Sequence, residues 1–419
     1  MRRLARLHPC LALAVFVGAL TSPARAQLSV AQRDALIAIH DSTNGPNWTD
    51  RTGWTAPGPG CNSVGVTCNQ AGTDVSSIQL YANNLQGPLP SLAAFTHLRI
   101  LGLSDNGLTG AMPSLQGLAS LVSVDIDGNQ LVGALPSLQG LSSLRSFNAA
   151  RNAFTGSLPP LQGAPLLQSF VVRDNALSGT LPSLAGMAEL SFFDVSENQF
   201  TGVAPSLAGL AKIEYYAVFD NALSGEIPAL SGLATLRSVD FSRNDFSGTL
   251  PVLTGLPALE AFSAEENALS GGIPSLGGLA QLRGFSVDTN NFTGPIPELS
   301  GNTALIVFNV NNNQLDGSVP ALTGLTQLQQ FHIANNRLTG PAPSLTGLDS
   351  LRAFLVGANR LTGPVPAPPA PSMLEAGASM LCPNAFAPAD FTPSAAWDSA
   401  TGFTPWWMSC EPVFQNGFE

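Results

Sequence analysis

The chain has 419 residues, of which 44% are hydrophobic and only 11% are charged, and its formal net charge is −11. A chain of this length can bury a sizeable core, but 41 glycines and 33 prolines are high counts for an ordinary globular enzyme. The acidic balance, with Lys212 as the only lysine, excludes nucleic acid and anionic membranes as favoured partners and points to basic proteins or cations.

The first 26 residues have the pattern of a secretory signal peptide. Three arginines precede the apolar run 10–20, and Ala24-Arg25-Ala26 supplies the small residues of a cleavage site. We expect cleavage after Ala26 and a secreted, periplasmic or cell-surface protein. The apolar run is too short to cross a bilayer, so no integral membrane protein is expected. Loss of four arginines and no acid would leave a net charge of about −15.

Residues 27–74 are predicted to form an N-terminal cap. Ser29 and Gln32 have the spacing of a capping box, and an apolar helical face follows over residues 35–39. The segment "STNGPNW" ends this helix near residue 44.

Four cysteines remain once Cys10 leaves with the signal peptide. An export compartment permits oxidation, so we expect Cys61 to pair with Cys68 and Cys382 with Cys410. Other pairings stay open at this point. A metal site would need tighter CxxC or histidine spacing, so neither a metal nor a cofactor is expected.

A strict repeat of 23 residues occupies positions 75–366, and we count thirteen copies of it. Each copy reads apolar-x-x-apolar-x-apolar-x-x-Asn, with Gly four positions and Pro seven positions after the Asn. The alternation predicts a short strand with one buried face, and strands that recur in one direction can only stack in parallel. The repeated asparagines form a ladder: Asn83, Asn106, Asn129, Asn152, Asn175, Asn198, Asn221, Asn244, Asn267, Asn290, Asn313, Asn336 and Asn359.

Each part of the repeat has a physical task. The chain turns inward after the strand and leaves backbone groups without partners, which a side-chain amide can satisfy as both donor and acceptor. The Gly permits a close or positive-φ turn, and the Pro fixes an extended return segment. An aromatic residue recurs at one core position, and we expect a stacked spine there: Phe147, Phe170, Phe193, Tyr216, Phe262, Phe285, Phe308, Phe331 and Phe354.

The consensus "LxxLxLxxNxLxGxLPxLxGL" resembles the plant-type leucine-rich repeat, although each unit is one residue shorter than usual. The resemblance implies an α/β-type repeat solenoid: a right-handed superhelix with a concave parallel β-sheet and a mostly irregular, 3-10 or polyproline convex side. Gly65-Val66-Thr67-Cys68 resembles the family's "GVxC" cap motif, with Ser63 in place of the usual Trp. The overall pattern is similar to receptor ectodomains and to secreted inhibitors of cell-wall hydrolases, and a bacterial source is suggested by the arginine bias.

Residues 367–419 begin with the proline-rich linker "GPVPAPPAPS" and continue into a segment with three tryptophans between the last two cysteines. We interpret the segment as a C-terminal cap, with a loosely ordered tail as the alternative. Whether the final "VFQNGFE" is a sorting or anchoring signal stays open.

Function is expected where the repeats differ, on the strand positions six, four, two and one before each ladder Asn. The resemblance implies that this concave face carries the ligand. The face is acidic, and outward aromatics occupy neighbouring repeats in its middle, as binding hot spots require. We propose a partner-binding centre of Phe192, Asp194, Tyr215, Phe219, Asp220 and Asp240, with Glu265 and Asp288 beside it. The alternative is that the rings only cover the sheet.

Three other chemistries have weaker support. Glu265 and Asp288 could approach the carboxylate separation of a retaining glycosidase, but an open sheet offers no deep pocket. The acids at 105, 125 and 127 could hold a cation. However, "DIDGNQLVG" lacks the glycine that an EF-hand loop has at its sixth position, and it lacks the terminal Glu. The Ser/Thr column before each Gly could suggest an array for ice or glycan, but the repeat consensus already explains it.

The sequence therefore favours a secreted, non-enzymatic protein that binds a macromolecular partner, most simply a protein. A cell-wall glycan-binding or adhesion protein, or one similar to hydrolase inhibitors, is the alternative. The chain contains no GxSxG, P-loop or HExxH motif, and His40, His97 and His332 stand alone.

Overall fold

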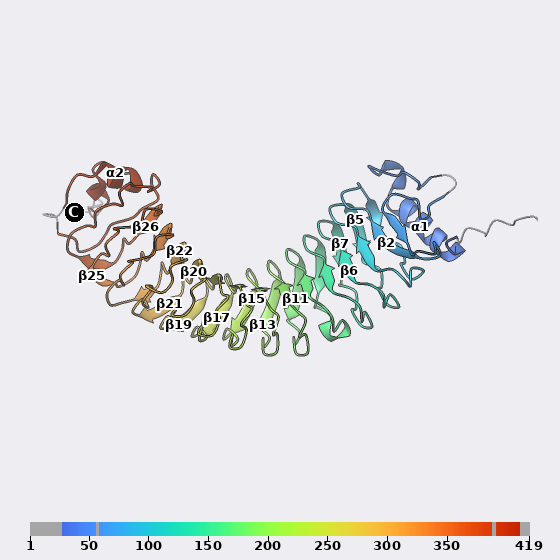
Figure 1. Ribbon diagram of the computed structural model, residues 1–419, viewed down its shortest axis with the longest axis horizontal. Coiled ribbons are helices and arrows are strands. Elements are labelled where there is room, and N and C mark those ends of the chain that lie inside the picture. Colours follow the sequence, from blue (N-terminus) through green and yellow to red (C-terminus); the bar gives the residue numbers. More distant parts are fainter. Residues whose placement is uncertain (1–26, 56–57, 388–390, 411–419) are drawn as a thin grey trace, which may run out of the picture.

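The computed structural model describes residues 27–55, 58–387 and 391–410, which form a crescent of stacked turns (Figure 1). The predicted signal peptide, 1–26, and the final "VFQNGFE" lie outside the described residues. Within the described part, no helix is both long and apolar enough to cross a membrane.

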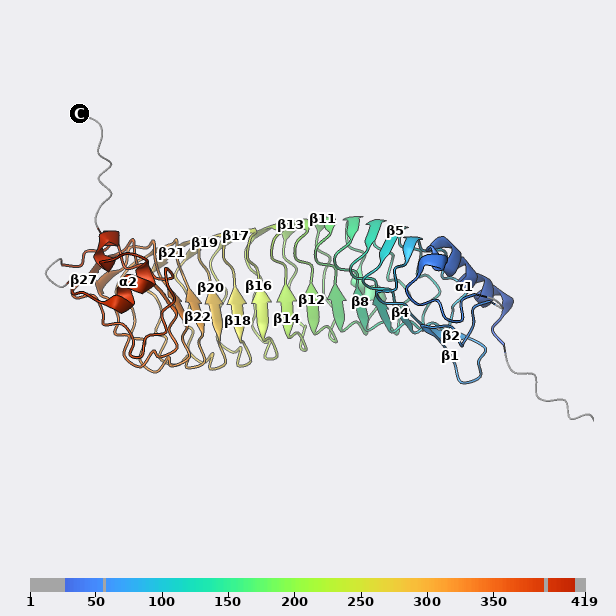
Figure 2. The ribbon, with the colours of Figure 1, turned by 90° about the horizontal axis from the view of Figure 1, so that it is seen from above.

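The inner side of the crescent is a sheet of 14 strands. The first two strands form a pair, and each later repeat adds one strand. Strand β1 (Val66–Cys68) is antiparallel to β2 (Val75–Gln79), and all later neighbours are parallel with partners 23 residues apart, such as Phe170 with Phe193. Figure 2 shows these strands side by side along the solenoid. In spatial order they are β1 (Val66–Cys68), β2 (Val75–Gln79), β4 (Ile100–Gly102), β6 (Ser123–Asp125), β8 (Ser146–Asn148), β10 (Ser169–Val171), β12 (Phe192–Asp194), β14 (Tyr215–Ala217), β16 (Ser238–Asp240), β18 (Ala261–Ser263), β20 (Gly284–Ser286), β22 (Val307–Asn309), β24 (Gln330–His332) and β26 (Ala353–Leu355).

A second parallel sheet of 11 short strands accompanies the irregular segments of the return path, which the sequence reading did not anticipate. It forms because the residues just after each ladder Asn are extended and repeat in register. The strands are β3 (Gln86–Pro88), β5 (Gly107–Ala111), β7 (Gln130–Gly133), β9 (Ala153–Gly156), β11 (Ala176–Thr180), β13 (Gln199–Val203), β15 (Ala222–Gly225), β17 (Asp245–Gly248), β19 (Ala268–Gly271), β21 (Asn291–Gly294) and β23 (Gln314–Leu315), and β25 (Thr339–Pro341) with β27 (Arg360–Thr362) form a separate pair.

The ladder asparagines bridge successive repeats. In Asn175 the side-chain N–H group donates to the carbonyls of Val172 at 3.0 Å and of Ala149, one repeat earlier, at 3.0 Å. Its side-chain oxygen accepts from the backbone N–H of Phe154 at 3.0 Å. One amide therefore satisfies buried backbone groups of two turns at once.

The aromatic spine lies between the two sheets and is buried. Its rings stack along the solenoid, as in Phe308 and Phe331, whose centroids are 5.7 Å apart. Val239 interrupts the column, and Phe241 fills the gap with its ring 5.7 Å from Tyr216. The hydroxyl of Tyr216 is buried without a hydrogen-bond partner among the described residues.

The N-terminal end is covered by helix α1 (Val30–Ser42) and a 3-10 turn, η1 (Gly45–Asn47). Ser29 caps α1 by accepting from the N–H of Gln32 at 3.2 Å. The Gln32 side chain does not return to Ser29; it accepts from the N–H of Val75 at 2.9 Å and so ties the helix to β2. The Cys61–Cys68 disulfide is present, and the buried Ser63 donates to the Gly53 carbonyl at 2.7 Å.

The C-terminal end is covered by helix α2 (Ala395–Thr401) and the 3-10 turn η4 (Trp406–Cys410), and a further 3-10 turn, η2 (Leu161–Gly163), lies within the repeats. The Cys382–Cys410 disulfide is also present, so both expected pairings are confirmed. Asn384 continues the ladder 25 residues after Asn359: it accepts from the N–H of Leu361 at 3.0 Å and donates to Val356 at 2.9 Å.

Candidate functional site

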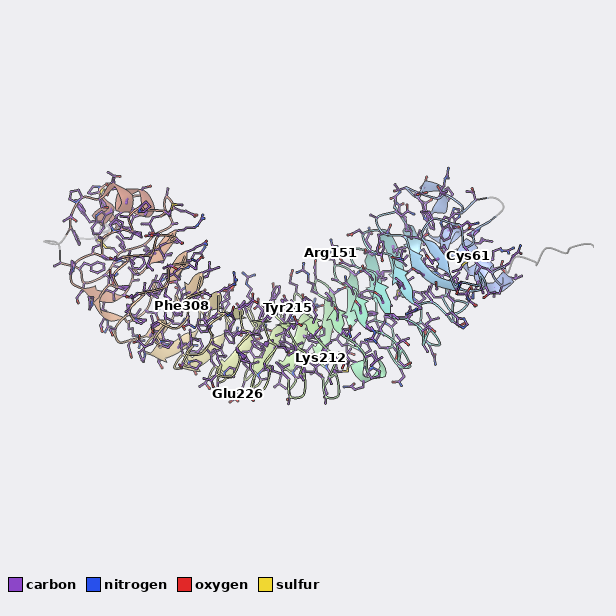
Figure 3. All side chains as sticks on the ribbon, viewed as in Figure 1. Cys61, Arg151, Lys212, Tyr215, Glu226 and Phe308 are labelled. Carbon is purple, nitrogen blue, oxygen red and sulfur yellow. A yellow bond between two sulfur atoms is a disulfide. The ribbon has the colours of Figure 1, made fainter. Side chains whose placement is uncertain are left out.

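The proposed binding centre lies at the middle of the inner sheet. In Figure 3, Tyr215 is on the inner side of the crescent and Glu226 on its outer side. Parallel pairing places Phe192 of β12 directly beside Tyr215 of β14. Their rings are stacked with centroids 4.3 Å apart and planes 8° from parallel, and both side chains are partly exposed. An apolar face of two rings is therefore presented to the hollow of the crescent.

Two carboxylates flank the strand that carries Tyr215. In the column of Ala217, Asp194 lies on one neighbouring strand and Asp240 on the other. Two strand spacings separate them, roughly 10 Å at the backbone. Ala217, between the two acids, is buried.

Both acids are desolvated. Asp194 is only 4% exposed and accepts from the backbone N–H of Ser196 at 3.1 Å. Burial raises the pKa of Asp194, and this effect outweighs the hydrogen bond from Ser196, which lowers it. Burial likewise raises the pKa of Asp240, which accepts from the Ser242 hydroxyl and from the Ser242 N–H at 2.9 Å. Burial, followed by the charges of both acids, raises the pKa of Tyr215 to about 12. Its phenol is therefore neutral at physiological pH.

The other two residues of the predicted centre, Phe219 and Asp220, lie outside the strands of the inner sheet. Phe219, partly buried, and Asp220, exposed, follow β14 on the same turn. Asp220 has φ 54°, in the left-handed region, and every other residue that precedes a ladder Asn also has a positive φ. This shared backbone turn was missed by the sequence reading.

Glu265 and Asp288 meet at one hydroxyl. The Ser286 Oγ lies 2.8 Å from Glu265 Oε2 and 3.0 Å from Asp288 Oδ1, and Asn309 donates to Asp288 at 2.7 Å. Burial and then Asp288 raise the pKa of Glu265. The two side chains are brought together as their shared column predicted, and each is held by neutral polar partners. The arrangement is that of a hydrogen-bonded surface cluster.

The acids at the start of the array already have partners: Asp105 and Asp127 share one guanidinium, and Asp125 accepts from a neutral amide. Arg151 donates to Asp127 at 2.9 and 2.5 Å and to Asp105 at 3.0 Å, while Asn148 donates to Asp125 at 3.1 Å. Among the described residues, no cluster of three His, Cys, Asp or Glu side chains could hold a metal ion. A cation from solution would have to compete with the guanidinium.

The Ser/Thr column on the second sheet contacts its own backbone. Thr201, Ser270 and Thr339 each donate to a glycine carbonyl of the preceding repeat, at 3.5, 3.3 and 3.3 Å. These hydroxyls therefore join neighbouring turns, in agreement with the structural interpretation of the column.

Sequence reasoning overlooked Ser196, Ser242 and Ala217. The signal was present as Asp-x-Ser, which occurs at Asp194 and again at Asp240 two repeats later. His332 lies further along the same column, where burial lowers its pKa. Its Nε2 has no hydrogen-bond partner in the described part of the chain.

No protein-family model and no curated protein matches the chain. Solved structures do. The ectodomain of the Arabidopsis receptor kinase HAESA, in complex with an N-terminally extended IDA peptide hormone ligand, is 28% identical with a TM-score of 0.69, over 85% of this chain and 62% of that one. The TDR receptor is 29% identical with a TM-score of 0.68, over 75% and 56%. A plant ice-binding protein is 25% identical with a TM-score of 0.55, over 65% and 90%.

The parallel solenoid, its asparagine ladder and these similarities define the class by its fold: the chain has the leucine-rich-repeat fold. Its fold is that of plant receptor ectodomains, and it spans somewhat more than half the length of the two receptor chains.

Proposed function

We propose that the protein is a non-enzymatic binding module whose concave face recognises a protein partner, as an extended segment carrying a basic side chain. The observation that supports this most is the partly exposed Phe192–Tyr215 stack beside the desolvated Asp194 and Asp240. The HAESA ectodomain, which shares the fold, is in complex with a peptide hormone ligand.

The chemistry of the centre favours a cation beside an apolar group. Aromatic faces attract ammonium and guanidinium groups, more strongly where water is excluded. Asp194 and Asp240 have no ion pair within 4.0 Å among the described residues, and Arg173 and Arg243 act on them only at longer range. A lysine or arginine of the partner would compensate the charge of these desolvated carboxylates and gain contact with the rings.

We further propose that the protein acts outside the cytoplasm, after removal of residues 1–26. The two disulfides fit an oxidising compartment. On this proposal residues 27–74 cap the front of the array, 75–366 form the thirteen repeats, and 367–419 form the linker and C-terminal cap.

Selection from a displayed library of random peptides tests the proposal. The full-length protein is immobilised, and recovered peptides are measured on the parent and on a Phe192→Ala, Tyr215→Ala, Phe219→Ala triple variant. We expect enrichment of lysine- and arginine-containing peptides whose affinity falls at least thirtyfold on the triple variant, about 2 kcal/mol, the size of a hot spot. Affinity should also weaken as salt is added.

Tyr81→Ala is the matched control, because Tyr81 is an exposed aromatic, 44% exposed, on the same face at the far end. This variant should retain the peptides. If the selected peptides bind the triple variant as tightly as the parent, the central rings are not the binding centre. Retention of cell-wall polysaccharides in place of peptides, lost on the triple variant, would replace the protein partner with a glycan.

A further inference from the structure

A column of side chains along the edge of the inner sheet has a different charge pattern from the binding centre. It consists of the residues seven positions before each ladder Asn, and five of them are arginines. Arg237 lies 2.7 Å from Glu260, Arg283 lies 4.0 Å from the same acid, and Arg352 lies 3.1 Å from Glu375. The other two, Arg99 and Arg145, have no carboxylate within 4.0 Å in the described part of the chain.

These two arginines line one cavity. Arg99, Val122 and Arg145 lie on successive turns, since the Val122 N–H donates to the Arg99 carbonyl at 2.8 Å and the Arg145 N–H to the Val122 carbonyl at 2.8 Å. The cavity has a volume of about 380 Å³, and its remaining walls are Ser120, Ser143 and Leu166. The backbones of Arg99 and Arg145 are two strand spacings apart, roughly 10 Å. Their two guanidinium groups therefore share one hollow, and Val122 is the residue of this column between them.

The two serines supply hydroxyls that the fold does not use. At the equivalent position of later repeats, Thr235 donates to the Ile213 carbonyl at 2.8 Å and Ser350 to the Thr326 carbonyl at 2.9 Å. Ser120 and Ser143 make no such bond to any described residue. The hollow thus combines two uncompensated cations with two available hydroxyl donors and contains no acid.

We infer that this hollow is an oxyanion site, which takes the sulfate or phosphate group of a ligand between Arg99 and Arg145. Guanidinium groups present planar pairs of N–H donors that match such oxygens, and serine hydroxyls complete the shell. An anion between the arginines also removes their mutual repulsion. The site lies at β4 to β8, apart from the aromatic centre at β12 to β16, and it does not depend on the function proposed for that centre.

Calorimetric titration with sodium sulfate, sodium phosphate and a sulfated oligosaccharide tests the inference, at constant ionic strength set by chloride so that screening is equal. The variants are Arg99→Gln with Arg145→Gln, and as a matched control Arg237→Gln, an arginine of the same column that is paired with acids. We expect the parent and the control to bind at least one probe, and the double variant to bind it at least tenfold more weakly.

Circular dichroism checks that the double variant keeps the parent's fold, which exposed arginines at a sheet edge should allow. Tighter binding of the oligosaccharide than of free sulfate would assign the site to a sulfated glycan, and equal binding would assign it to a small free anion. Absence of binding to the parent, or equal affinity of parent and double variant for every probe, would overturn the inference.

Discussion

The asparagine ladder makes a quantitative prediction at Asn290. Its side-chain N–H group donates to the carbonyl of Ala264 at 2.9 Å and to those of Val287 and Asp288 at 3.2 and 3.1 Å, and its oxygen accepts from the N–H of Leu269 at 2.9 Å. The residue is 8% exposed, so water replaces few of these bonds. Asn290→Ala removes all four and keeps the backbone.

The cost follows from the groups left behind. A buried donor or acceptor without a partner costs about 1–3 kcal/mol. The N–H of Leu269 loses its acceptor, the side-chain oxygen of residue 290. The three carbonyls share one amide group as donor, so their loss costs less than three separate hydrogen bonds. We therefore expect a loss of about 3 kcal/mol in the free energy of unfolding. Asn290→Asp should cost at least as much, because it places a carboxylate where three carbonyls need a donor.

Urea unfolding followed by circular dichroism measures the total, and hydrogen exchange at the Leu269 amide measures the local effect. Exchange there should accelerate because opening of the turn becomes easier. The neighbouring Asn291, whose side chain is exposed, provides the control: Asn291→Ala should change stability by less than about 0.5 kcal/mol. If Asn290→Ala matched this control and left Leu269 protected, the ladder would not hold the repeats together.

Three further outcomes are expected. Tyr216→Phe should raise the free energy of unfolding by about 1 kcal/mol in urea, since it removes a buried hydroxyl that has no partner. Asp194→Asn should stabilise the protein at neutral pH. Burial raises the folded-state pKa of this acid, so its cost to stability is absent below the unfolded pKa, grows between the unfolded and the folded pKa, and is complete above the folded pKa; unfolding at pH 3 and pH 7 can compare the two limits. Reducing the Cys382–Cys410 bond, which spans a sequence separation of 28, should destabilise the C-terminal cap by about 3.6 kcal/mol and expose it to proteases first.

The repeat explains why so much of the fold could be predicted. A strict period of 23 fixes which residues share a column, and parallel pairing then follows from direction alone. The spine of rings and the ladder could be read from one unit and copied. Val239 marks the limit of this reasoning, because the compensating Phe241 comes from another column of the core and is recognised only when the rings are placed in space.

The ends could not be copied from a neighbour. The Gln32 side chain has two uses, as half of a capping box or as a bond to β2, and the choice depends on how closely the helix approaches the sheet. Asn384 breaks the period by two residues, so no count from Asn359 finds it. The left-handed turn before each Asn was also missed, because Asp105 and Arg151 there look like ordinary exposed strand residues.

In the candidate site, the repeat predicts which residues are neighbours, but it does not predict how buried or how well paired they are. The sequence placed Phe192 beside Tyr215 correctly, because register alone decides it. It described the face as acidic overall, whereas packing separates the acids into those already paired, as Asp127 is with Arg151, and those that are buried without an ion pair, as Asp194 is. Only the second kind gains from a cationic partner. The binding centre that we propose beside Tyr215 therefore rests on how the charges are distributed over the sheet, which the net charge of the chain cannot convey.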